Sequence, residues 1–157
     1  MNQAPVSELN RRITEATKLY SRLVVLVGRS GSGKSEALQE LGAKIHSSIV
    51  NVNLELSRRM LELTERQRVL RSQQLLGEIV SAISGDVTLL DNLEILFHPG
   101  LRQDPLRLLE GLSRNTTIVV AWGGSIIGGH LVYAEPGHRE YRRYPVQDFL
   151  VVSAESR

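Results

Sequence analysis

The segment from Gly28 to Ser35 reads Gly-Arg-Ser-Gly-Ser-Gly-Lys-Ser, a complete G-x-x-x-x-G-K-[ST] phosphate-binding motif. An apolar run, residues 23–27, precedes the motif, and a helix-favouring segment, residues 36–41, follows it. A buried strand, a glycine-rich turn and the start of a helix form the context in which this motif grips a phosphate chain. The motif therefore predicts a strand–loop–helix unit with a nucleotide-binding site at its turn.

The residues of this loop have separate expected roles. The glycines let the backbone turn and approach an anion closely, so that successive main-chain N–H groups face a phosphate. Lys34 is expected to place its ammonium group on the β- and γ-phosphates, and the Ser35 hydroxyl is expected to bind Mg²⁺. The Arg29 side chain is expected to face solvent or a neighbouring molecule. The predicted nucleotide-binding residues are Gly28, Arg29, Ser30, Gly31, Ser32, Gly33, Lys34, Ser35 and Glu36.

The composition narrows the class of protein. A chain of 157 residues, 41% hydrophobic and 23% charged, predicts a single globular domain over residues 1–157. The absence of cysteine excludes disulfides and thiolate metal sites, and the four histidines lack metal-ligand spacing. The apolar runs are too short to span a membrane and no signal-peptide pattern is seen, so we expect a cytoplasmic protein. A net charge of +2 gives no argument for nucleic-acid binding.

The spacing of apolar residues predicts helices that alternate with strands. Helices are expected over residues 6–22, 34–46, 54–84 (broken near 71–72) and 104–112. Strands are expected over residues 23–27, 48–52, 87–91, 116–121 and 146–152, with a hairpin over 126–133 and a polar loop over 135–144. Such alternation predicts a three-layer α/β P-loop NTPase fold with a mainly parallel central sheet of about five strands.

A second set of candidate site residues follows the strand over 87–91. Asp91 ends this strand, where an aspartate can orient Mg²⁺ or its water, so we expect Ser35 and Asp91 to form the metal site. Many ring-forming ATPases carry a glutamate directly after this aspartate, but here the next residue is Asn92. Glu94 is the nearest acid and the candidate catalytic base. The alternatives are that Asp91 caps a turn and that Glu94 is a solvated carboxylate.

Arginines near the end of the chain could reach the γ-phosphate of a neighbouring subunit. Arg142 and Arg143 precede the last predicted strand, where oligomeric ATPases commonly carry an arginine that raises the rate in trans. Lys34, Asp91, Glu94, Arg142 and Arg143 are therefore the predicted catalytic residues, and an oligomer is expected. The alternative is that the arginines belong to a solvated basic loop.

Four stretches of the second half carry a resemblance to a known family. They are residues 89–97 (Leu-Leu-Asp-Asn-Leu-Glu-Ile-Leu-Phe), 103–109 (Gln-Asp-Pro-Leu-Arg-Leu-Leu), 112–115 (Leu-Ser-Arg-Asn) and 133–141 (Tyr-Ala-Glu-Pro-Gly-His-Arg-Glu-Tyr). Together they resemble the BrxF family, small P-loop proteins of BREX bacteriophage-resistance systems. The resemblance implies a bacterial cytoplasmic ATPase related to the AAA+ group. It also implies work with a larger ATPase, a methyltransferase and other defence components on DNA, with direct DNA contact left open. The sequence departs from standard AAA+ proteins because it has no glutamate after Asp91 and no helical lid domain is expected.

The favoured prediction is an ATP–Mg²⁺-binding component of such a defence complex, with slow or partner-stimulated hydrolysis. Two other functions stay open. Compact small-molecule kinases use similar loops, although Asn51 and Asn53 stand where such kinases usually present an acid. A non-catalytic, nucleotide-dependent adaptor is the other alternative, and Asn92 supports it.

Overall fold

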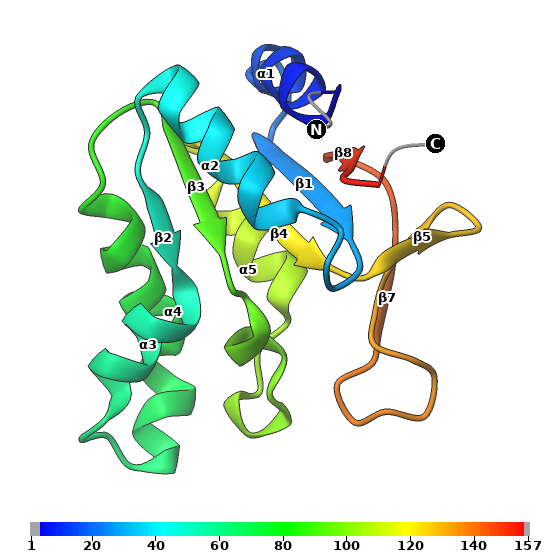
Figure 1. Ribbon diagram of the computed structural model, residues 1–157. Helices are drawn as coiled ribbons and strands as arrows, with labels where there is room; N and C mark the ends of the chain where they lie inside the picture. Colours follow the sequence, from blue (N-terminus) through cyan, green and yellow to red (C-terminus); the bar gives the residue numbers. More distant parts are fainter. Residues whose placement is uncertain (1–3, 156–157) are drawn as a thin grey trace.

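The structure is a computed structural model that describes residues 4–155 (Figure 1). The helices are α1 (Ala4–Ala16), α2 (Lys34–Ile45), α3 (Val52–Met60), α4 (Glu65–Ser81) and α5 (Pro105–Leu112), with short 3-10 turns η1 (Glu94–Phe97) and η2 (Pro99–Leu101). The strands are β1 (Leu23–Gly28), β2 (Ile49–Asn51), β3 (Val87–Asp91), β4 (Thr117–Gly123), β5 (Ser125–Ile127), β6 (His130–Tyr133), β7 (Arg142–Pro145) and β8 (Leu150–Ser153).

Five strands form a parallel central sheet in the order β2-β3-β4-β1-β8. Gly28 at the end of β1 lies opposite Gly123 at the end of β4, and Asn51 at the end of β2 lies opposite Asp91. Because all five strands run the same way, their carboxyl ends meet at one edge, where ligands bind in open α/β sheets. The predicted five-stranded parallel sheet is confirmed.

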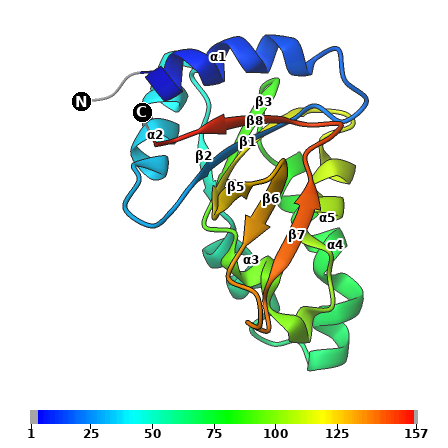
Figure 2. The same cartoon turned by 90° about the vertical axis from the view of Figure 1, so that its right-hand side faces the viewer.

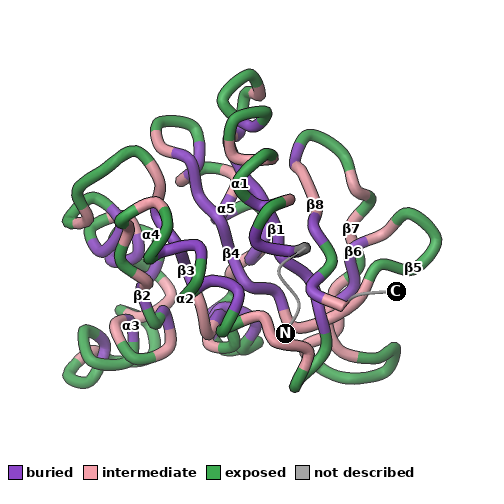
Figure 3. Tube along the Cα trace, turned by 45° about the horizontal axis from the view of Figure 1, so that its top comes forward, coloured by how far each residue is buried: buried purple, intermediate pink, exposed green. Residues whose placement is uncertain are grey.

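Helices cover both faces of this sheet, which gives three layers (Figure 1). Alternate residues of β1 show the division: Val24 and Leu26 pack with α1 and α2, whereas Val25 and Val27 pack with α3, α4 and α5. Every residue of β1 is buried, as expected for a central strand of a parallel sheet (Figure 3). The predicted three-layer α/β fold of the P-loop NTPase type is confirmed.

A second sheet follows the central strand β4. Strands β5, β6 and β7 form an antiparallel sheet in that order, and the predicted hairpin is its first half (Figure 2). Trp122 joins the two sheets: it is 1% exposed, and its Nε1 donates a hydrogen bond to the Val132 carbonyl at 3.2 Å. The sheet lies beside the carboxyl edge of the central sheet and so borders the expected site.

The prediction of a polar loop over residues 135–144 was wrong at its end, because Arg142–Pro145 forms β7. Alternate side chains of β7 are half-buried: Tyr144 packs edge-on against Trp122 with ring centroids 6.0 Å apart, whereas Arg143 is exposed. Two adjacent arginines hid this alternation in the sequence. The last central strand accordingly begins at Leu150, later than predicted.

Two helix boundaries also differ from the predictions. The first helix ends at Ala16, and residues 17–21 form turns. The long helical segment breaks at residues 61–64, not near 71–72, because Thr64 starts α4 with a capping box. The Thr64 hydroxyl accepts a hydrogen bond from the Gln67 N–H at 3.2 Å, and the Gln67 side chain accepts one from the Thr64 N–H at 2.9 Å.

Candidate nucleotide-binding site

The predicted phosphate loop joins β1 to α2 as its motif requires. Gly33 has φ +93°, a left-handed conformation that costs glycine little, and α2 begins at the next residue. Gly28 is needed for space, because a Cβ there would collide with the buried Ser32 hydroxyl. The loop therefore leads directly into the amino end of α2, whose first N–H groups have no partner within the helix.

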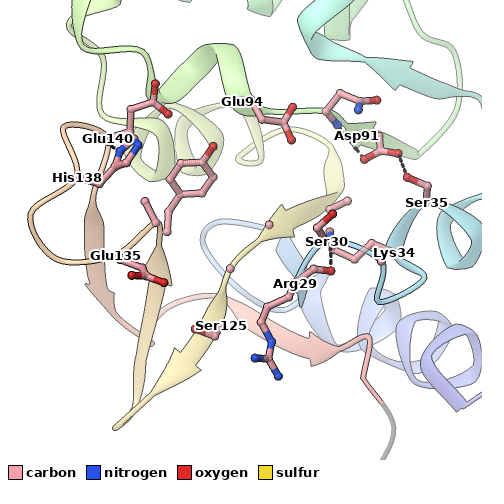
Figure 4. Close-up of a pocket in the computed structure, with 17 residues that line it drawn as sticks. Arg29, Ser30, Lys34, Ser35, Asp91, Glu94, Ser125, Glu135, His138 and Glu140 are labelled. Carbon is pink, nitrogen blue, oxygen red and sulfur yellow. Dashed lines mark hydrogen bonds between the residues drawn. The ribbon is translucent and has the colours of Figure 1, made fainter.

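Lys34 lies across the loop. Its ammonium group donates a hydrogen bond to the Arg29 carbonyl at 3.1 Å, so that the side chain runs back over the loop residues (Figure 4). The Arg29 side chain is 77% exposed and pairs with Glu155, with 3.4 Å between Nε and the carboxylate. Hydrogen bonds from Arg29 hold the pKa of Glu155 below its ordinary value. The Lys34 side chain therefore contacts the backbone of the loop, whereas the Arg29 side chain points to solvent and pairs with Glu155.

Asp91 meets Ser35 at the carboxyl edge of the sheet. The Ser35 hydroxyl donates a hydrogen bond of 2.7 Å to Asp91 Oδ2, and the Asn92 N–H donates one of 2.8 Å to Oδ1 (Figure 4). A hydroxyl and a carboxylate are hard oxygen donors of the kind that Mg²⁺ prefers. Within residues 4–155, no group of three or more His, Cys, Asp or Glu side chains could hold a metal. A magnesium ion would therefore take few ligands from the protein and the rest from phosphate and water.

Glu94 is held by a residue that sequence reasoning missed as part of the site. Asn53 donates from its side-chain amide to the Glu94 carboxylate at 2.9 Å, and its side-chain oxygen accepts from the Ile95 N–H at 2.7 Å. The Asn53 N–H also donates to the Asn92 carbonyl at 2.9 Å. Asn53 follows β2, whose end lies beside Asp91, so the strand order carried a signal that Asn53 would be close. Asn92, whose carbonyl accepts this hydrogen bond, has a left-handed backbone conformation with φ +57°.

These groups border a cavity of about 620 Å³ with two unlike walls. We name the first the phosphate-loop wall, formed by Arg29, Lys34, Ser35 and Asp91 with the other loop residues. The second, the hairpin wall, comes from β6 and the segment that follows it. It consists of Tyr133, Glu135, His138 and Glu140. Figure 4 shows the labelled residues of the two walls on opposite sides of the space, with Glu94 between them.

The hairpin wall was not predicted as part of the site. Tyr133 of this wall has a shifted pKa: burial, and then the charges of Glu140 and Glu94, raise it to about 12. His138 accepts a hydrogen bond from the Glu140 N–H at 3.0 Å, which ties the segment after β6 together. The carboxylates of Glu135 and Glu140 on this wall lie across the cavity from the ammonium group of Lys34. The hairpin wall is therefore negative where it borders the space opposite this lysine.

Six predicted site residues lie outside the cavity lining: the loop residues Gly28, Ser32 and Gly33, and also Glu36, Arg142 and Arg143. Glu36 is exposed in the first turn of α2. Arg142 donates to the Gln103 carbonyl at 2.9 Å, whereas Arg143 is exposed on β7. The structure therefore brings together the phosphate loop, Asp91 and Glu94 and leaves both arginines apart from them within one chain.

No protein-family model and no curated protein sequence matches the chain. Among solved structures, the chain is similar to the structure of C. elegans PCH-2, with a TM-score of 0.47 and 14% sequence identity. The alignment covers 96% of this chain and 42% of the PCH-2 chain, so this chain spans less than half the length of that protein. No helix in the part of the chain that the structure describes is long and apolar enough to cross a membrane.

Proposed function

We propose that this protein binds ATP together with Mg²⁺ at the phosphate loop and hydrolyses it slowly. The contact of 2.7 Å between the Ser35 hydroxyl and Asp91 carries this proposal, because it joins the two expected metal contacts across distant parts of the chain. Lys34 and the main-chain N–H groups of the loop would hold the phosphates. In this role Ser35 and Asp91 would orient the ion, which neutralises charge on the phosphates when bound.

Hydrolysis needs little covalent chemistry from the protein, because phosphoryl transfer depends on positioning and charge stabilisation. We assign Glu94 as the base that takes the proton of the attacking water. Asn53 fixes the Glu94 carboxylate by a hydrogen bond of 2.9 Å, so the base has a defined position. Glu94 is exposed and lies three residues after Asp91, which favours slow turnover unless a partner completes the site.

The proposal is tested by replacing Asp91 and measuring phosphate release from ATP. Asp91→Asn removes the negative charge but keeps the shape, so we expect Mg²⁺-dependent release to fall by roughly 10²-fold. The matched control is Asp86→Asn, which lies just before the amino end of the same strand and is exposed. Equal turnover in both variants and in the unmodified protein would exclude Asp91 as a metal contact.

We further propose that the site is completed by a second copy of the chain. Arg143 is the better candidate than Arg142, because Arg142 already binds the Gln103 carbonyl in its own chain. An arginine supplied in trans raises phosphoryl-transfer rates by about 10³–10⁵-fold. Mixing Arg143→Ala protein with Asp91→Asn protein should therefore restore part of the activity that each lacks. Mixed oligomers without restored activity would contradict a shared site.

The biological setting that we propose is a bacterial, cytoplasmic anti-phage complex of the BREX type. The sequence resemblance over residues 89–97 and 133–141 supports this setting, and DNA would be reached through the other components. The same proposal takes residues 1–157 as one P-loop NTPase domain. Phage protection in cells that carry the complete defence system should be lost with Lys34→Ala, and full protection would contradict a role for ATP.

A small-molecule kinase is the second candidate, and the hairpin wall favours it. Tyr133, Glu135, His138 and Glu140 line the cavity opposite the phosphate loop, where an acceptor could be held. A panel of hydroxyl and amine acceptors separates the two functions. Release of ADP well above the basal rate with one acceptor would identify a kinase, whereas nucleotide binding without any turnover would indicate an adaptor.

A further inference from the structure

Tyr133 and Glu94 are joined through one short segment of the chain. Tyr133 ends β6, and its ring stacks on Phe97 with centroids 3.6 Å apart and an angle of 10° between the planes. Phe97 ends η1, the turn that begins at Glu94. The segment that carries the proposed base therefore also carries the ring that fixes Tyr133.

A second set of contacts holds the tyrosine from the side of the central sheet. Phe97 packs edge-on against Trp122 with centroids 5.1 Å apart, and the Trp122 Nε1 donates to the carbonyl of Val132, the residue before Tyr133. Phe97 and Trp122 are both buried. The Tyr133 ring thus has a defined place between the two sheets, while the residue still lines the cavity.

Tyr133 lines the same cavity as two carboxylates, those of Glu94 and Glu140. Burial, and then the charges of Glu140 and Glu94, raise its pKa to about 12. The phenol therefore stays protonated at neutral pH. A protonated phenol donates one hydrogen bond and still accepts through its oxygen. It can donate to a carboxylate and at the same time accept from a water molecule.

We propose that Tyr133 is a positioning residue for hydrolysis, which holds the attacking water together with Glu94. This proposal rests on the proposed ATPase function. The water donates one O–H to the Glu94 carboxylate and the other to the Tyr133 oxygen, which leaves its lone pair free to face the γ-phosphorus. Its oxygen then bonds to phosphorus, the bond to the bridging oxygen of ADP breaks, and the proton passes to Glu94.

Tyr144 provides a matched comparison in the same antiparallel sheet. It also packs against Trp122, but its hydroxyl donates to Asp104 at 2.9 Å, at the amino end of α5. Asp104 caps α5 and does not line the cavity. Burial and the bond to Asp104 raise the pKa of Tyr144 as well. The two tyrosines share a setting, and only one of them faces the cavity.

The test replaces each tyrosine by phenylalanine and measures kcat, KM for ATP and the thermal unfolding midpoint. Tyr133→Phe keeps the stacked ring, so kcat should fall roughly 10-fold while KM and the unfolding midpoint stay unchanged. Tyr144→Phe should lower the unfolding midpoint and leave kcat unchanged. In a Glu94→Gln background, Tyr133→Phe should cost little more, because both residues act on the same water.

Unchanged kcat in Tyr133→Phe would overturn the proposal, as would full additivity with Glu94→Gln. Absence of ATP hydrolysis in the unmodified protein would contradict the ATPase function itself. A second measurement tests the role of Tyr133 even in that case. ADP with aluminium fluoride mimics the transferring phosphoryl group with its in-line water, and calorimetry gives its affinity. Tyr133→Phe should weaken this complex roughly 10-fold and leave ADP binding unchanged, whereas equal affinity for the mimic would overturn the role of Tyr133.

Discussion

The two walls of the cavity differ in how the chain builds them. The phosphate-loop wall comes from one contiguous motif that joins β1 to α2, with Asp91 added from a neighbouring part of the same sheet edge. The hairpin wall comes from a separate antiparallel sheet and the segment between its second and third strands. The difference teaches that one contiguous motif is enough to form most of the first wall, whereas the wall opposite depends on the packing of two sheets.

The walls also differ in charge, which indicates separate tasks. Lys34 would attract the phosphates from one side, while Glu135 and Glu140 on the other would repel them. We therefore expect the phosphate-loop wall to control affinity for the nucleotide. The hairpin wall, together with Glu94, should control the rate of reaction or the approach of a second group.

The largest effect should come from the cation of the phosphate-loop wall. Lys34→Ala removes the ammonium group that would face the phosphates, so the Kd for ATP should rise about 100-fold, or about 2.8 kcal/mol. The control is Lys44→Ala, an exposed lysine in the last turn of the same helix. Calorimetric titration measures both. If Lys34→Ala binds ATP as tightly as the control, affinity does not reside on this wall.

The second-largest effect, a loss of kcat, should come from Glu94, which lies between the two walls. Glu94→Gln keeps the hydrogen bond from Asn53 possible but removes the base, so kcat should fall by roughly 10²-fold or more. The Kd for ATP should change little, because the Glu94 carboxylate is held by Asn53 and not by a residue of the phosphate loop. Steady-state phosphate release with Glu62→Gln, an exposed glutamate in the turn after α3, as control measures the effect. An equal loss of affinity would place Glu94 in binding instead.

A smaller effect, a gain instead of a loss in affinity for ATP, should come from changes in the hairpin wall. Replacing Glu135 and Glu140 together by Gln removes two negative charges from the wall opposite the phosphate loop, so affinity for ATP should rise a few-fold at low salt. The gain should shrink as ionic strength increases. Titrations at two salt concentrations measure it. A loss of affinity would mean that this wall helps to bind the nucleotide, and the contrast between the walls would be wrong.

The smallest effect on the site should come from a change far from both walls. Thr64→Ala breaks the capping box of α4, which should lower the free energy of unfolding by about 1 kcal/mol. Affinity for ATP should stay the same. Denaturant unfolding and calorimetry on the same preparation measure the two quantities. A change in affinity would show that the helices on the far face of the sheet also shape the cavity.

Local signals account for what the sequence predicted well. The strand β1, the loop and α2 were placed within one residue because the motif fixes all three. Asp91 was found because it ends an apolar run. The capping box that begins at Thr64 was also written in the sequence, as a threonine followed three residues later by glutamine, but it was overlooked.

Tertiary packing accounts for what the sequence did not predict. Tyr133 lines the cavity because its ring stacks on Phe97, a contact between residues far apart in the chain that no local pattern announces. Asn53 reaches Glu94 because β2 lies beside β3 in the sheet, so that the segments after these two strands meet. The strand β7 was hidden because Arg142 and Arg143 broke the expected alternation of apolar residues.

The central claim is that the phosphate loop binds a nucleotide with Mg²⁺ between Ser35 and Asp91. Its most direct test is calorimetric titration of the unmodified protein with ATP, with and without Mg²⁺. We predict a clear binding heat that strengthens when Mg²⁺ is present, and a loss of this strengthening in Asp91→Asn. Folded protein that gives no heat with ATP under either condition would contradict the account.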